Sequence, residues 1–203
     1  MDFMTLGRQC APMADPHILM AIVRTESAFR PYAIGVNGGH RLVRQPETQD
    51  EAVALATDLI GRGYSIDLGL AQINSANLSV LGLSVADAFD PCKNINAAAR
   101  LFKSDYRRAL SAGHAGDGAL VAALSAYNTG SFTKGVHNGY VRKVLANLGD
   151  AAKQQISFSG DLPVISPVPE KSASPLLAHA AEASPSGVMV YAAGSRPCLI
   201  FQP

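Results

Sequence analysis

Apolar residues recur every three or four positions through much of the first 150 residues, which is the spacing of helices that pack one side against a core. The clearest case follows Asp15-Pro16, a typical helix start in which Asp is the N-cap and Pro the first helical residue. This helix is expected to run to about Phe29. It should stop before Arg30-Pro31, because a residue that precedes proline disfavours helical backbone.

The same pattern predicts four more helices. Thr48-Gln49-Asp50-Glu51 is a capping box that starts one of them, and Gly61 and Gly63 should end it. Asn94 is expected to cap a long helix that ends at Gly113. The last two are expected from Ala119 to about Tyr127, capped by Asp117, and from about Gly139 to Leu148.

One small β element is predicted after the first helix. Ile34–Val36, the turn residues Asn37-Gly38 and then Leu42-Val43 resemble a hairpin. Short turns are expected around residues 78–81 and 85–89. The predicted fold class is therefore mainly α, with a minor β-hairpin.

Composition changes near residue 150. Seven of the 12 prolines fall in residues 156–203, together with many Ser and Ala residues, and proline breaks long helices and central strands. We predict a helical domain over residues 1–150 and a Pro/Ser/Ala-rich linker or tail, partly disordered, over 151–203. The tail either docks on another component or serves as a spacer.

Charge and cysteine usage exclude several functional classes. Seventeen basic residues oppose 16 acidic ones, and a net charge of +1 does not favour nucleic-acid binding. The longest apolar runs before residue 150, of which Ile18–Val23 is one, are too short to span a membrane. Cys10, Cys92 and Cys198 are too sparse for a zinc site, so no metal and no cofactor are expected.

Residues 1–20 lack the pattern of a signal peptide, which leaves the route of export open.

One residue of the first helix is out of place on its apolar side. Leu19, Ile22, Val23 and Phe29 follow core-facing spacing, and position 26 of the same stripe is Glu26. A carboxyl in such surroundings disfavours its charged form and is suited to act as a general acid. Alternatively, Glu26 lies at the rim, in solvent or paired with Arg30 four residues later.

Four short motifs in a fixed order carry a family resemblance. They are Glu26-Ser27 followed by Arg30-Pro31, Gly69-Leu70-Ala71-Gln72-Ile73-Asn74, Asp90-Pro91-Cys92-Lys93-Asn94-Ile95 and Ala126-Tyr127-Asn128-Thr129-Gly130. This series resembles the lytic transglycosylase domain of the lysozyme-like superfamily over residues 10 to about 148. Asp67, Asn77-Leu78, Phe89 and Gly139-Tyr140-Val141 are similar to the small branch attached to type IV secretion and conjugation systems.

The resemblance implies a lysozyme-like α+β fold and a peptidoglycan-cleaving enzyme. Glu26 would protonate the β-1,4 bond between N-acetylmuramic acid and N-acetylglucosamine, and would then take the proton of the muramic acid 6-hydroxyl. The product is a 1,6-anhydro sugar, and one carboxyl suffices because the substrate supplies the nucleophile. The implied place of action is the periplasm or cell envelope. The implied partners are glycan strands and, through the tail, components of a type IV secretion system.

The resemblance also supplies the expected substrate-binding residues. Tyr127 would bring its hydroxyl to the catalytic glutamate, Gly69 would let the backbone approach a sugar, and Gln72 would bind it through its amide. The full expected set is Ser27, Gly69, Gln72, Asn74, Tyr127 and Asn128. Each also has a purely structural interpretation as a helix, turn or core residue.

Two positions depart from the family pattern. Ala71 stands where many members have Met, and Gly35 stands where many have a serine that helps to hold the N-acetyl group. Asn37 is a candidate to compensate for that serine. Asp67 either orders the turn at Gly69 or acts as a second carboxylate, which would make the enzyme a hydrolytic lysozyme.

Cysteine placement is also similar to the secretion-associated branch, in which Cys10 and Cys92 would form a disulfide; the alternative is two reduced thiols in the core. Cys198 is left over in the tail. Besides a lysozyme, a non-catalytic glycan-binding scaffold remains an alternative function, although the presence of Glu26, Gln72 and Tyr127 favours an intact site.

Overall fold

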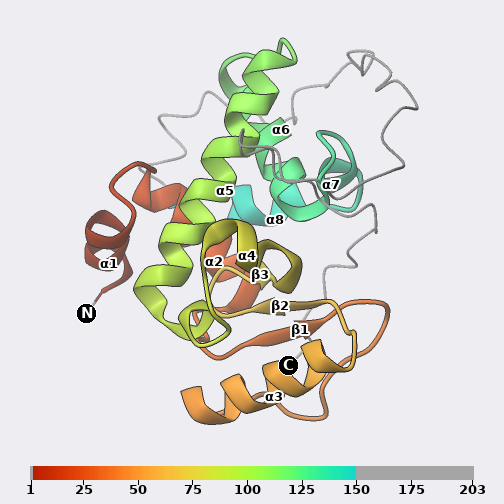
Figure 1. The fold of residues 1–203 in the computed structure, drawn as a ribbon. Helices are drawn as coiled ribbons and strands as arrows, with labels where there is room; N and C mark the ends of the chain where they lie inside the picture. Colours follow the sequence, from red (N-terminus) through yellow and green to blue (C-terminus); the bar gives the residue numbers. More distant parts are fainter. Residues whose placement is uncertain (1, 150–203) are drawn as a thin grey trace.

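The computed structural model describes residues 2–149, and the predicted tail lies outside the described residues. Helices form most of this part of the chain, and a small sheet lies toward one end (Figure 1). The helices are α1 (Phe3–Cys10), α2 (Pro16–Ser27), α3 (Gln49–Gly61), α4 (Leu78–Leu81), α5 (Pro91–Ser111), α6 (Gly116–Thr129), α7 (Lys134–His137) and α8 (Tyr140–Ala146), with 3-10 turns η1 (Ser75–Asn77) and η2 (Asp87–Phe89). The strands are β1 (Ile34–Val36), β2 (Ile66–Leu68) and β3 (Ile73–Asn74).

The long helix α5 runs through the centre of the molecule and joins its two ends (Figure 1). α6, α7 and α8 pack together beside its C-terminal half, and α2 packs against both α5 and α8. The sheet and α3 lie at the other end. One continuous apolar core includes buried residues of α2, α5, α6, α8 and the sheet, so the prediction of a mainly helical fold with a minor β element is confirmed.

Two of the predicted helix starts are confirmed by their capping bonds. The Asp15 carboxylate accepts the backbone N–H of His17 over 2.7 Å, and the Thr48 hydroxyl accepts that of Glu51 over 3.3 Å. Side-chain caps satisfy N–H groups that the first helical turn leaves without partners. Local sequence therefore places α2 and α3 well.

Other helix starts were predicted incorrectly. α5 begins at Pro91 with Asp90 as its N-cap, so Asn94 lies inside the helix rather than at its start. α6 has Ala115 at its N-cap position, and Asp117 lies in its first turn without capping it. α1 was not predicted; Asp2 caps it by accepting the N–H of Thr5 over 3.0 Å.

The predicted hairpin is wrong in its second strand. β1 pairs with β2 and β2 with β3, all antiparallel, whereas Leu42 and Val43 lie in a loop. The physical reason is that the Gln45 side chain occupies the outer edge of β1. Its amide oxygen accepts the N–H of Ile34 over 2.8 Å, and its nitrogen donates to the Ile34 carbonyl over 3.0 Å. A side-chain amide thus takes the place of a neighbouring strand.

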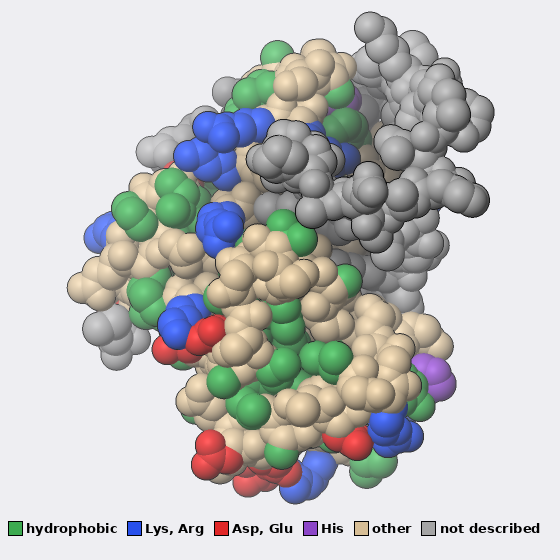
Figure 2. Space-filling view, viewed as in Figure 1, with side chains coloured by type: hydrophobic (Ala, Val, Ile, Leu, Met, Phe, Trp, Pro, Cys, Tyr) green, Lys and Arg blue, Asp and Glu red, His purple; other side chains and the backbone are tan. Residues whose placement is uncertain are grey.

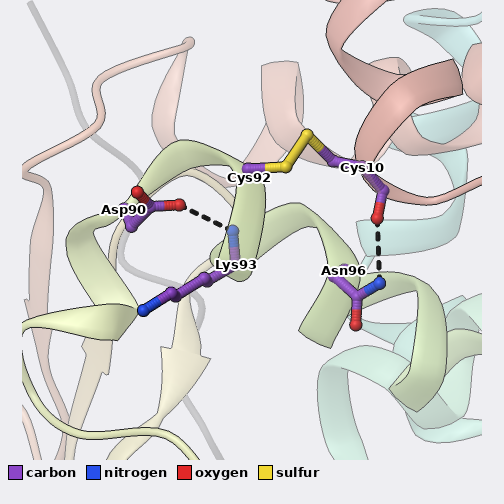
Figure 3. Close-up of a disulfide and its surroundings, with 5 residues drawn as sticks. All are labelled: Cys10, Asp90, Cys92, Lys93 and Asn96. Atoms are coloured by element: carbon purple, nitrogen blue, oxygen red, sulfur yellow. Dashed lines mark hydrogen bonds between the residues drawn. A yellow bond between two sulfur atoms is a disulfide. The ribbon is translucent and has the colours of Figure 1, made fainter.

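A disulfide between Cys10 and Cys92 joins the end of α1 to the start of α5 (Figure 3). The two Cα atoms are 5.1 Å apart, within the usual range for a disulfide. Asn96 donates to the Cys10 carbonyl over 2.8 Å, one turn further along α5. A covalent bond and a hydrogen bond therefore fix α1 on the long helix.

Candidate active site

Glu26 lies in the last turn of α2, where the apolar stripe of the helix leaves the core. Leu19, Ile22 and Val23 of this stripe are fully buried, while Glu26 is half-buried. The Tyr140 hydroxyl donates to Glu26 Oε1 over 2.7 Å. The carboxyl group is thus partly shielded from water and held by a side chain from α8.

The chain makes a strained turn directly after the Glu26-Ser27 pair. Ala28 and Phe29 both adopt left-handed backbone, with φ of 51° and 64°, a conformation that costs non-glycine residues free energy and often marks a functional site. Phe29, predicted to face the core, is instead 39% exposed. It lies beyond the end of the helix, with its ring against Phe3 of α1 at 5.5 Å between centroids.

Two buried tyrosines have their hydroxyl groups in defined hydrogen bonds, and that of Tyr140 donates to the glutamate. Tyr127 is buried and donates to the Ala71 carbonyl over 2.8 Å. Tyr140 is 1% exposed and shares its buried side of α8 with Val141 and Val144. The signal was present in the Gly139-Tyr140-Val141 motif, but sequence alone does not show which tyrosine reaches across to α2.

The loop around Gly69 is built onto the start of α5. Asn94 is 1% exposed; its amide nitrogen donates to the carbonyls of Leu68 and Ala88 over 2.9 and 2.7 Å, and its oxygen accepts the N–H of Ala71 over 2.8 Å. Gly69 has φ of 74°, and a Cβ there would lie 2.4 Å from the Ala88 carbonyl oxygen. Gly69 therefore allows a close approach of backbone to backbone. Asn94, expected as a helix cap, organises this loop instead.

The side chain of Gln72 explains one departure from the family pattern, namely the glycine at position 35 where many members have serine. Its backbone is left-handed, with φ of 50°, and its side-chain nitrogen donates to the carbonyls of Ala33 and Gly69 over 3.2 and 2.9 Å. A Cβ on Gly35 would lie 2.8 Å from Gln72 Oε1. A serine at position 35 would therefore require the Gln72 amide to move.

Asp67 connects two asparagine amides on the sheet. Its Oδ1 accepts the Asn74 side chain over 2.8 Å, and its Oδ2 accepts that of Asn37 over 3.0 Å. Gly35, Asp67 and Asn74 are cross-strand neighbours. Asn74 also accepts the N–H of Ala76 over 3.0 Å and starts η1. These contacts give Asp67 and Asn74 structural roles in ordering the sheet.

The remaining predicted residues lie close to the glutamate or its tyrosine. Ser27 is 1% exposed, and its hydroxyl donates to the Val23 carbonyl within α2. Asn128, at the end of α6, accepts the Asn138 amide over 2.9 Å, and the Asn138 oxygen in turn accepts the N–H of Tyr140 over 2.9 Å. Asn138 was not among the residues predicted from the sequence. Its only signal is an asparagine two residues before a buried helical tyrosine.

Across residues 2–149 no group of three or more His, Cys, Asp or Glu side chains is arranged to hold a metal ion. In the same part of the chain, every helix is too short or too polar to cross a membrane.

A family model described as Transglycosylase SLT domain matches residues 4–148. The chain belongs to this family. Its predicted class, a lytic transglycosylase with a lysozyme-like fold, is confirmed by that match, and the substrate of the family is peptidoglycan.

Several curated relatives are named as type IV secretion system proteins. The chain is 42% identical over 178 residues to the "Type IV secretion system protein virB1" of Brucella suis, which covers 85% of this chain and 73% of that protein. It is 40% identical over 158 residues to "Protein virB1" of Agrobacterium fabrum, covering 76% of this chain and 60% of the relative. Since the Brucella match covers 85% of the chain, it extends past the residues matched by the family model.

Proposed function

We propose that this lytic transglycosylase uses Glu26 to cleave the bond between N-acetylmuramic acid and N-acetylglucosamine, with formation of a 1,6-anhydro end. The observation that carries the proposal is the half-buried Glu26 carboxyl with the Tyr140 hydroxyl 2.7 Å from Oε1. A carboxyl with restricted access to water and one fixed hydrogen-bond donor is suited to transfer a proton to a bound substrate.

The proposed reaction returns Glu26 to its starting state. Protonated Glu26 donates its proton to the glycosidic oxygen, and the bond to the muramic anomeric carbon breaks as positive charge develops on the sugar ring. The Glu26 carboxylate then takes the proton of the muramic 6-hydroxyl, and the 6-oxygen bonds to the anomeric carbon. No water is consumed and no second carboxylate is required.

Tyr140 has two roles in this scheme. Its O–H donates to Oε1, so a proton on the carboxyl group is favoured on Oε2, which orients it. The same hydrogen bond strengthens when Glu26 becomes an anion, because hydrogen bonds to ionised acceptors are stronger than neutral ones. Tyr140 therefore stabilises the state that follows proton donation.

Asp67 supports this scheme over a hydrolytic one with two carboxylates. Each of its oxygens accepts a side-chain amide, from Asn74 and from Asn37. These bonds hold the carboxylate as part of the sheet. Analysis of products separates the two reactions, because hydrolysis gives reducing ends and transglycosylation gives anhydro ends.

The proposed setting is the periplasm, where the enzyme opens the wall for a type IV secretion or conjugation apparatus. The name of the Brucella relative, a type IV secretion system protein, supports this role. The Cys10–Cys92 disulfide supports an oxidising compartment. We extend the proposal to the predicted tail of residues 151–203, as the segment that docks on the apparatus. Because the proposed catalytic residues precede this tail, deletion of residues 156–203 should leave glycan cleavage unchanged.

The decisive experiment is digestion of purified sacculi by the full chain and by Glu26→Gln, followed by mass analysis of the muropeptides. We expect anhydro products from the unaltered protein and a loss of at least about a hundredfold in their rate of release by the variant. Glu47→Gln, an exposed substitution in a loop, serves as the control. Equal product release by Glu26→Gln would remove Glu26 from its role, and reducing ends alone would replace the anhydro mechanism with hydrolysis.

A further inference from the structure

The near-neutral chain is divided into two parts of opposite charge. Residues 1–99 contain seven Lys or Arg and ten Asp or Glu, a formal charge of −3. Residues 100–149 contain seven Lys or Arg and two Asp, a formal charge of +5. The second segment is the C-terminal half of α5 with α6, α7 and α8, which pack together. We call this part of the molecule the basic lobe.

The basic charges of this lobe are at the surface, and its acidic charge is partly hidden. Asp105 is 1% exposed and forms an ion pair with Arg108 over 2.8 Å. All seven basic side chains are exposed. Figure 2 shows Lys and Arg side chains over the upper part of α5, while acidic side chains stand among basic ones near α3 at the lower edge. The charge asymmetry of the sequence is thus also an asymmetry of the surface.

Five of these cations are available to a ligand. Lys103, Arg107, Lys134, Arg142 and Lys143 have no carboxylate within ion-pair distance among residues 2–149. By contrast, Arg44, Arg62 and Lys93 in the first part of the chain each pair with an acidic side chain. Unpaired surface cations attract a polyanion, and at moderate salt this attraction extends over about 10 Å.

The basic lobe is also next to the candidate active site. Arg142 and Lys143 follow Tyr140 within one turn of α8, which places their Cα atoms about 5 Å from that of the tyrosine. Their side chains are exposed while Tyr140 is buried against Glu26. A polymer bound at Glu26 therefore lies beside the helix that carries these two cations.

We propose that the basic lobe binds the free carboxylates on the peptide stems of peptidoglycan and holds the enzyme on the wall around the strand that it cuts. The inference rests on the proposed function, since it concerns the same substrate. Peptide stems carry several carboxylates spaced along each glycan strand, and they match exposed cations that are spread over several helices. The lobe thus recognises the stems, while the site at Glu26 recognises the sugars.

The test is sedimentation of the full-length protein with purified sacculi at 4 °C, at increasing salt. Lys103→Glu/Arg107→Glu reverses two cations on α5, away from Tyr140. Arg8→Glu/Arg41→Glu is the matched control, because it makes the same change in net charge at exposed positions of the other part. Lys103→Gln/Arg107→Gln removes the same two positive charges without introducing negative ones. It replaces the charge-reversal variant if that variant does not fold.

We expect the binding of the unaltered protein to native sacculi to weaken as salt rises. We also expect it to bind more weakly to sacculi whose carboxylates have been converted to amides. The apparent affinity of the α5 variant for native sacculi should fall about tenfold, while the control stays within about twofold. Equal binding by the α5 variant and the unaltered protein, an equal loss in the control, or undiminished binding to amidated sacculi would each overturn the proposal.

Cleavage of stem-free glycan strands, prepared with an amidase, separates this inference from the proposed function. The amidase leaves a lactyl carboxylate on each muramic acid, and these carboxylates are converted to amides before the assay. We expect the α5 variant to cleave the resulting neutral strands at the unaltered rate, because they carry no carboxylates for the basic lobe. A failure of the unaltered protein to cleave them would contradict the proposed function, whereas sedimentation would still decide whether the basic lobe binds stems.

Discussion

At the scale of single residues, two buried tyrosines from the predicted motifs have different hydrogen-bond acceptors. Tyr140 donates to Glu26, and Tyr127 donates to the Ala71 carbonyl. The side chain that stabilises the carboxylate should govern turnover. The side chain that holds a backbone carbonyl should govern the stability of the Gly69 loop.

Tyr140→Phe is expected to lower kcat by about tenfold to a hundredfold, because it removes one donor from a group that becomes anionic during the reaction. KM for glycan should change little. The measurement is the rate of anhydro-product release at saturating substrate. An unchanged kcat would show that the hydrogen bond to Glu26 is not used in catalysis.

Tyr127→Phe is expected to act on stability. It leaves the buried Ala71 carbonyl without its hydroxyl donor, which should reduce the free energy of unfolding by about 1–3 kcal/mol. Urea unfolding measures this change. A larger fall in kcat than in Tyr140→Phe, at equal stability, would reverse the roles assigned to the two tyrosines.

Sequence identified Glu26 for a physical reason: it is a carboxyl on the apolar stripe of a capped helix. The stripe is confirmed at Leu19, Ile22 and Val23. The partner of Glu26 could not be derived in the same way, because Tyr140 is 114 residues away and the contact depends on how α8 packs against α2. Both tyrosines also fit the pattern of buried helical residues.

At the scale of elements, Asn138 links the end of α6 to the start of α8. Its amide donates to Asn128, and its oxygen accepts the N–H of Tyr140, the first residue of α8. We therefore expect Asn138→Ala to lower kcat through the position of Tyr140. In a Tyr140→Phe background, the same substitution should have little further effect on kcat.

A matched control exists for this double-mutant cycle. Asn147 also joins α8 to α2, donating to the Thr25 hydroxyl over 2.9 Å, but it does not accept the N–H of Tyr140. Asn147→Ala should change kcat by the same factor in both backgrounds. If Asn138→Ala behaves in this additive way too, its role is general stabilisation of α8.

Gly69→Ala is expected to destabilise the fold by about 2–4 kcal/mol, because left-handed backbone and a clash with the Ala88 carbonyl add together. Gly82→Ala is the control: its φ is 69°, but nothing lies within 4 Å of the new Cβ. It should cost about 1 kcal/mol. Thermal unfolding of both variants tests the difference, and equal losses would show that the close approach at Gly69 is unimportant.

Elements that begin with a local signal were predictable, as the caps at Asp15 and Thr48 show. The sheet was not, because β1 pairs with a strand some 30 residues away rather than with the nearest apolar pair. The start of α5 was missed although its local signal was present. Asp90-Pro91 repeats the Asp15-Pro16 start of α2, with Asp as the N-cap and Pro as the first helical residue.

At the scale of the whole molecule, the disulfide closes a long loop between α1 and α5. Cys10 and Cys92 are separated by 82 positions, and a loop of this length is expected to contribute about 4–5 kcal/mol in the chain-entropy model. Cys10→Ser/Cys92→Ser should therefore unfold at a clearly lower temperature, with glycan cleavage retained at 25 °C. The same melting temperature with and without the disulfide would contradict this expectation.

The covering of β1 by Gln45 limits how the enzyme can be recruited. Exposed sheet edges commonly capture an extended peptide by adding it as a further strand. Here the outward N–H and C=O of Ile34 are already occupied from within the chain. A binding protein that relies on strand addition would first have to displace this glutamine, so any docking at this end of the molecule must depend on side chains rather than on backbone pairing at β1.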